Sequence, residues 1–189
     1  MPNADLIALA LVFIQSSLCT TFTAAAIQKA RAAREFSAGL AAFGIPSQLR
    51  RPATNMLIAC EVIAAALMLS SGRSAVAGFE LCTVMLFTFS VALSRSIVSG
   101  AAVECNCFGP SGRPVSAFDV ARNVGLLIVA LTGWLCAAAF PSAATSPLET
   151  AISAVRTGNT TIVAVAVAAA ALALVWAQLP QIAALVRVE

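Results

Sequence analysis

The sequence contains no histidine and no tyrosine, and only 10% of its 189 residues are charged. Without an imidazole ligand, histidine-ligated haem and the common zinc and copper sites are excluded. Any chemistry must therefore depend on cysteine, carboxylate or arginine side chains, or on a bound organic cofactor. The formal net charge of +3 is too small and too dispersed along the chain to indicate a nucleic-acid partner.

The chain is instead rich in apolar residues. They make up 60% of the chain, and the mean hydropathy is +0.95. An average soluble domain has about 25% charged residues. Because a water-soluble fold of this size cannot bury so much apolar surface, the composition predicts an all-α integral membrane protein in contact with the lipid bilayer.

Uncharged stretches long enough to cross a bilayer recur along the sequence. A hydrocarbon core of about 30 Å requires about 20 helical residues. We expect membrane spans over 6–28, 52–71, 75–94, 116–140 and 160–177. The first is not a typical cleaved signal peptide, because no lysine or arginine precedes it. The whole chain, 1–189, is expected to form a single membrane domain.

Two connections are predicted to lie on the same side of the membrane. Segment 29–51 has Ala32, Phe36, Leu40 and Phe43 at helical spacing beside several basic residues. This pattern predicts a short amphipathic helix in the interface, ending at Gly44–Pro46, although a charged surface connector remains an alternative. The second connection is 95–115, and it also contains basic residues. The rule that basic loops face the cytoplasm, applied literally, places both connections there.

The second connection contains the C-x-C-F-G sequence that begins at Cys105 and includes Cys107. Both thiols lie in a polar stretch bounded by glycine and proline, where they gain little from packing. A disulfide between residues i and i+2 closes a small, strained ring, which favours reduction and a catalytic role. The following helix N-terminus favours a thiolate. Cu(I) binding by the two thiolates, or a structural role, remains an alternative.

Ionisable residues also occur within the predicted spans. Glu61 follows Cys60 about 13 Å below the C-x-C side, and Arg122 lies about 10 Å below it in the next-but-one span. Because an isolated charge in hydrocarbon is costly, a buried Glu61–Arg122 pair is expected. It could lock two helices together, move a proton or bind a quinone carbonyl. Cys19 and Cys60 are expected at similar depths, either as a thiol relay or as small apolar residues.

The order of these motifs resembles the methylamine utilisation MauE family, within the wider DoxX-like membrane proteins. The resemblance is carried by Ala59-Cys60-Glu61, by Cys105 to Gly109, and by Ala121-Arg122-Asn123. It implies a four-helix core like that of vitamin K epoxide reductase, to which we add a fifth span. It also implies a bacterial inner-membrane protein with its thiols on the periplasmic side, opposite to the count of basic residues. Because disulfides persist in the periplasm, we favour that side.

The sequence and the resemblance together give a functional hypothesis. Cys105 and Cys107 would exchange thiols and disulfides to support maturation of an exported, disulfide-containing protein, with a thioredoxin-like partner. Glu61, Arg122 and Asn123 would be supporting polar groups, and a quinone is the candidate electron acceptor. A non-catalytic assembly subunit or chaperone, and a Cu(I)-handling protein, are the alternatives.

Overall fold

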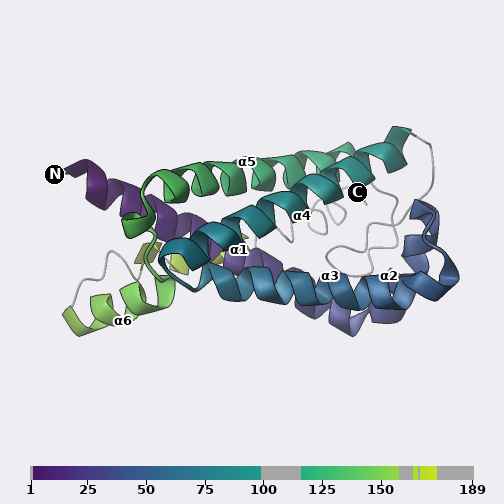
Figure 1. Ribbon diagram of the computed structural model, residues 1–189, viewed down its shortest axis with the longest axis horizontal. Helices are drawn as coiled ribbons and strands as arrows, with labels where there is room; N and C mark the ends of the chain where they lie inside the picture. Colours follow the sequence, from purple (N-terminus) through teal and green to yellow (C-terminus); the bar gives the residue numbers. More distant parts are fainter. Residues whose placement is uncertain (1, 99–115, 158–163, 166, 174–189) are drawn as a thin grey trace, which may run out of the picture.

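Four long helices form the body of the protein (Figure 1). The computed structural model describes residues 2–98, 116–157, 164–165 and 167–173. The long helices are α1 (Pro2–Arg31), α3 (Ser47–Met68), α4 (Gly72–Val98) and α5 (Ala117–Ala139). All four contain windows long and apolar enough to cross a membrane. The prediction of an all-α membrane protein is therefore confirmed.

The buried side of each long helix follows a repeat of alternating three and four residues. Along α1 the buried positions include Leu11, Gln15, Leu18, Phe22, Ala25 and Lys29. Along α5 they include Asp119, Asn123, Ala130, Gly133 and Ala137. This spacing is that of the packed seam in helical bundles, so each helix presents one continuous stripe to its neighbours. The stripe on α1 ends at Lys29 and the stripe on α5 begins at Asp119, and both of these residues are charged.

The outward faces of the helices are apolar. Val62 and Ile63 on α3, Phe87 on α4 and Ile128 on α5 are each more than half exposed. In a soluble protein such surfaces would be an aggregation hazard, but within a bilayer they contact lipid chains. The distribution of exposed residues therefore fits a multi-pass membrane protein.

Glycines allow close helix packing at two points. A Cβ atom on Gly133 of α5 would collide with the ring of Phe79 from α4. A Cβ on Gly78 of α4 would meet Met68 and the backbone of Leu67 on α3. Small residues let backbones approach in membrane bundles, where van der Waals packing is a main source of helix association. These contacts set the spacing of α4 from both neighbours.

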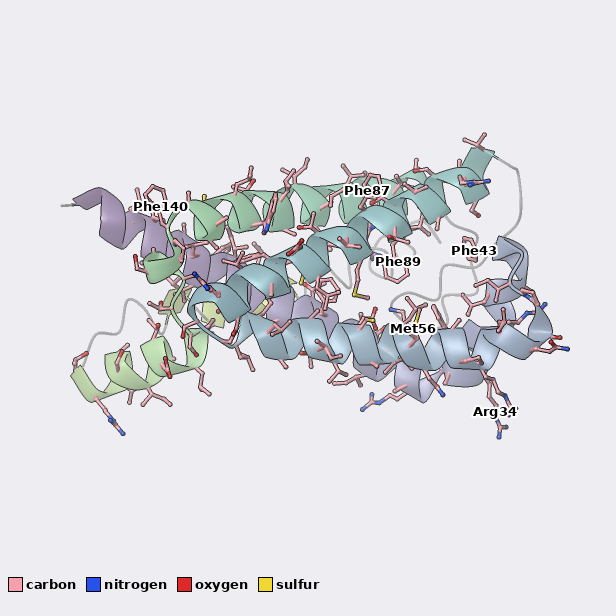
Figure 2. All side chains as sticks on the ribbon, in the orientation of Figure 1. Arg34, Phe43, Met56, Phe87, Phe89 and Phe140 are labelled. Carbon is pink, nitrogen blue, oxygen red and sulfur yellow. The ribbon has the colours of Figure 1, made fainter. Side chains whose placement is uncertain are left out.

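A short helical segment connects α1 to α3 at one end of the bundle. It consists of α2 (Ala33–Gly39) and the 3₁₀ helix η1 (Leu40–Phe43), with Phe36 and Leu40 buried. The helical segment ends at Gly44, whose φ of 77° is readily adopted by glycine. Arg34 points away from the bundle (Figure 2). Of the predicted apolar residues, Phe36 and Leu40 are therefore buried, whereas Phe43 is exposed.

At the opposite end of the bundle, which we call the closed end, hydrogen bonds connect α1 and the segment after α5 to the α3–α4 turn. Gln15 of α1 donates to the carbonyls of Met68 (3.3 Å) and Ser70 (3.2 Å). Ser146 donates to the carbonyl of Leu69 (2.6 Å). These bonds satisfy carbonyl groups at the end of α3 that lack a partner within the helix.

Two elements after α5 were not expected from the sequence. They are the 3₁₀ helix η2 (Pro141–Ala143) and α6 (Pro147–Thr157), which lies at the closed end of the bundle (Figure 1). The predicted fifth span, 160–177, is described only at 164–165 and 167–173, which are helical. There Ser17 of α1 donates to the carbonyl of Ala169 (3.4 Å).

Helices α1 and α4 extend beyond their predicted spans at both ends, α3 is displaced towards the N-terminus, and α5 lies within its predicted span. Helix α1 continues to Arg31, and α3 starts at Ser47, before the predicted span at 52–71. Pro52 therefore lies inside α3 rather than in its first turn. Because α1 continues past residue 28, Lys29 belongs to a membrane helix and not to the connection.

Candidate functional site

A buried polar site lies inside the bundle, at the last turn of α1, near the middle of α3 and α4, and on the second turn of α5. Its main feature is an ion pair between Lys29 of α1 and Glu61 of α3, with Nζ 2.5 Å from Oε1. The side chains are only 1% and 2% exposed. An unpaired charge inside a membrane bundle is costly, and the opposite charges of Lys29 and Glu61 offset that cost for each other.

The predicted Glu61–Arg122 pair is wrong, because Glu61 is paired with Lys29 instead. Depth alone was the basis of that prediction, and it did not specify which helix faces Glu61. The contact is made by α1, which packs along α3. The buried stripe on α1 places Lys29 four residues after Ala25, on the same face. That spacing is the signal in the sequence that could have identified Lys29.

Two aromatic rings accompany the lysine. The Lys29 ammonium lies 5.5 Å from the ring centroids of both Phe36, on α2, and Phe89, on α4. This distance is within the range in which a ring face attracts a cation. Phe89 points towards the interior of the bundle in Figure 2, whereas Arg34 points away. The short segment between α1 and α3 thereby helps to hold the ammonium group.

Asn123 connects α5 to α4 within the same region. Its Nδ2 atom donates to the carbonyl of Leu86 (3.0 Å) and to the hydroxyl of Ser90 (2.9 Å). Arg122, beside it in the sequence, is also buried, at 4% exposure. Both sequence-predicted residues of α5 therefore lie in the interior, and Asn123 has a defined role in packing.

The start of α5 is fixed by a capping interaction that sequence reasoning missed. Oδ2 of Asp119 accepts hydrogen bonds from the backbone N–H (3.0 Å) and the hydroxyl (2.8 Å) of Ser116. The Ser-x-x-acid spacing is the signature of a capping box and could have been recognised. Asp119 is buried at the helix N-terminus, where a carboxylate is favoured by the helix dipole.

A small cavity adjoins the ion pair. Its volume is about 30 Å³. All four long helices contribute to its wall, which consists of Thr21, Phe22, Ala25, Lys29, Glu61, Leu86, Phe89, Asn123 and Leu126. Glu61 has one oxygen, Oε2, that finds no hydrogen-bond partner among the described residues. The site thus combines a buried ion pair with space beside it.

The remaining sequence-predicted residues are the cysteines. Cys19 and Cys60 are partly buried free thiols that pack against the apolar core. Cys105 and Cys107 lie outside the described residues. Within the described ranges, no group of three or more cysteine, aspartate or glutamate side chains is arranged to hold a metal ion. What the described site offers chemically is a carboxylate, an ammonium group and an amide, which can bind and orient polar groups or exchange protons.

The spans and the buried polar site define a multi-pass helical membrane protein with a charged pair inside its bundle. The model of the methylamine utilisation protein MauE family matches residues 7–136, which include α1 to most of α5. The chain belongs to this family, whose name ties it to methylamine utilisation. No curated protein and no solved structure matches the chain.

Proposed function

We propose that this protein is a membrane-embedded thiol–disulfide redox protein that supports disulfide formation in an exported partner. The observation that carries the proposal is the position of the polar site. Helix α4 ends at Val98 and α5 is capped at Ser116, and the buried Lys29–Glu61 pair lies deeper in the bundle, beyond Asn123 on the second turn of α5. The chain between these two helix ends contains Cys105 and Cys107.

The proposed reaction exchanges one disulfide for another. A partner thiolate attacks one sulfur of a Cys105–Cys107 disulfide, which forms a mixed disulfide and releases the other cysteine as a thiolate. The second partner thiolate then attacks the mixed disulfide and completes the partner's disulfide. The partner dithiol loses two electrons, and Cys105 and Cys107 become a dithiol. A disulfide of a thioredoxin-like protein, or a quinone, accepts the two electrons in the next turnover.

The size of the cavity limits where such a quinone would bind. An engineered cavity of about 150 Å³ holds benzene. The cavity beside Glu61, at about 30 Å³, is too small for a ring of that size. In this proposal a quinone therefore docks elsewhere on the bundle, and Glu61, Arg122 and Asn123 support the fold or proton movement rather than bind the ring. Cys19 and Cys60 remain the proposed relay thiols.

We further propose that the C-x-C sequence faces the periplasm of a bacterial inner membrane. Disulfides persist there and are reduced in the cytosol. The basic residues of 29–51 favour the opposite orientation when counted as a loop. One of them, Lys29, is neutralised inside the bundle by Glu61, which weakens that count.

The test is partner oxidation in membranes carrying Cys105→Ser, Cys107→Ser or the control Cys136→Ser. Cys136 is a partly buried thiol on the second half of α5, away from the polar site. We expect either C-x-C variant to abolish formation of the partner disulfide, measured by thiol alkylation and gel shift. The control variant should retain it.

Other outcomes would decide among the alternatives. Full partner oxidation in both Cys105→Ser and Cys107→Ser would refute the redox proposal and favour an assembly subunit. Protection of both thiols from alkylation by Cu(I) would favour copper handling. Labelling of intact spheroplasts with a membrane-impermeant maleimide tests the orientation, and exclusion of the reagent would contradict the periplasmic placement. Loss of oxidation in Cys19→Ser or Cys60→Ser would support the relay.

A further inference from the structure

Besides the ammonium group of Lys29, the wall of the cavity beside the ion pair contains polar groups that accept hydrogen bonds. Oε2 of Glu61 is buried and has no partner among the described residues. The other oxygen, Oε1, accepts from Lys29. A buried polar atom without a partner costs about 1–3 kcal/mol, so such atoms in folded proteins generally bind an ordered water.

Asn123 presents a second acceptor to the cavity. Its two amide hydrogens are donated to the carbonyl of Leu86 and to the hydroxyl of Ser90. The bond to a carbonyl, which cannot donate, fixes the orientation of the amide. Only the oxygen of Asn123 is left to meet a ligand, and it can only accept. Thr21 similarly uses its hydroxyl hydrogen on the carbonyl of Ser17 (2.8 Å), which leaves its oxygen as an acceptor.

Volume and polarity together determine what the cavity can hold. One water molecule needs about 10–15 Å³ of such space, so a cavity of about 30 Å³ accommodates one or two. Apolar cavities remain dry, whereas polar ones with two or more partners for each water are hydrated. A small ligand that donates hydrogen bonds fits the acceptor oxygens of this wall.

We propose that this cavity is an internal water site, in which one or two water molecules donate hydrogen bonds to Oε2 of Glu61 and to the oxygen of Asn123. The water completes the hydrogen bonding of a charged pair that the bilayer cannot solvate. It also gives Glu61 a neighbour with which to exchange a proton. Forming a disulfide from two thiols releases two protons, and this carboxylate could take up one of them. That consequence rests on the proposed function, but the water site itself does not.

Radiolytic hydroxyl-radical labelling tests the site in the full-length protein reconstituted in lipid nanodiscs. Radicals formed from a bound water modify the side chains around it, and mass spectrometry locates the products. Phe22 lines the cavity and Phe79 does not, although both belong to the buried core, at 4% and 0% exposure. We expect Phe22 to be modified several-fold faster than Phe79.

A matched pair of variants tests whether the label comes from the cavity. Ala25 lines the cavity, and its neighbour Ala26 is buried outside the cavity wall. Ala25→Val adds two methyl groups to the space, so the rate at Phe22 should fall to that of Phe79. Ala26→Val adds the same bulk elsewhere and should leave the rate unchanged. Equal rates at the two phenylalanines in the wild type, or an unchanged rate at Phe22 in Ala25→Val, would overturn the proposal.

Infrared spectroscopy provides a second measurement if Ala25→Val does not fold. The wild type and Glu61→Gln are compared in ordinary water and in water labelled with ¹⁸O. We expect a water O–H stretching band that shifts with ¹⁸O and changes in Glu61→Gln, because an amide replaces the carboxylate acceptor. Identical isotope-sensitive spectra for the two proteins would refute water at Glu61. Neither measurement depends on partner oxidation, so the water site and the proposed function can fail separately.

Discussion

Replacing Lys29 by methionine would remove one charge of the buried pair while keeping a long, unbranched side chain. Glu61 would then be buried without a cation beside Oε1, since its ion pair is with Lys29. The reciprocal change, Glu61→Gln, keeps the shape of the side chain and leaves the ammonium of Lys29 without its carboxylate. Combining the two changes removes both charges and leaves a neutral contact. These three variants form a double-mutant cycle on the central interaction of the site.

The magnitude follows from the burial of both groups. Breaking a buried ion pair on one side typically costs about 3–5 kcal/mol, because the remaining charge is uncompensated. The stranded group can escape that cost by becoming neutral. At pH 7 neutralisation costs about 3.7 kcal/mol for a glutamate and about 4.6 kcal/mol for a lysine, from ordinary pKa values of about 4.3 and 10.4. These two values are upper limits on the free energy of unfolding that a stranded charge can cost in Lys29→Met and in Glu61→Gln, respectively.

The double variant should be much less affected than either single one. Replacing both members of a buried pair by neutral groups of similar volume is often nearly neutral. We therefore expect a coupling energy of at least about 3 kcal/mol in the cycle. In Lys29→Met the cost should also decrease at lower pH, because protonating a glutamate at pH 5 costs only about 1.0 kcal/mol.

Equilibrium unfolding in mixed micelles measures the free energies of all four proteins at pH 7 and pH 5. The reasoning predicts a large loss in each single variant, recovery in the double variant, and partial recovery of Lys29→Met at pH 5. A loss below about 1 kcal/mol in Lys29→Met at pH 7 would mean that Glu61 is well solvated without Lys29. Additive effects of the two changes would refute a direct interaction between these residues.

Three further variants test the packing and capping of the bundle by the same unfolding measurement. Gly133→Val should lose about 1–3 kcal/mol because its side chain meets the Phe79 ring, whereas Ala139→Val on the exposed part of α5 should be near neutral. Asn123→Leu should cost about 1–3 kcal/mol by removing the two hydrogen bonds that the amide donates to α4. Ser146→Ala should cost about 0.5–1.5 kcal/mol by removing the hydrogen bond to the end of α3, with unchanged stability contradicting that role.

The membrane class and the long helices could be predicted from the sequence because each depends on local composition. An uncharged stretch of about 20 residues has few alternatives to a membrane helix, since its backbone must be satisfied within the segment. The structure places α1, α3, α4 and α5 over the first four predicted spans. Helix α6 is different, because its 11 residues are too short and too polar to be found by a search for spans.

The error over the partner of Glu61 has a physical cause. Helical rise gives the depth of a residue in the membrane but not the direction in which its side chain points. Arg122 and Lys29 both lie near the depth of Glu61, and only the rotation of each helix distinguishes them. Lys29 was assigned to a connection because a lysine was expected to end a span. Its position on the buried stripe of α1 instead indicates that Lys29 belongs to the helix and faces the bundle interior.

The location of the polar site depends on the buried stripes of α1 and α5 as much as on individual residues. On α1 the repeat that begins with Leu11 reaches Lys29, and on α5 the repeat that ends with Ala137 starts from Asp119. Apart from Gln15, which bonds to the α3–α4 turn, the named positions of both repeats are apolar except near the end of α1 and the start of α5. A lock between helices would serve equally well anywhere along the seam. The polar residues of this site instead reach the first turns of α5, which follow the connection containing Cys105 and Cys107, and a cavity adjoins them. This arrangement favours a functional site.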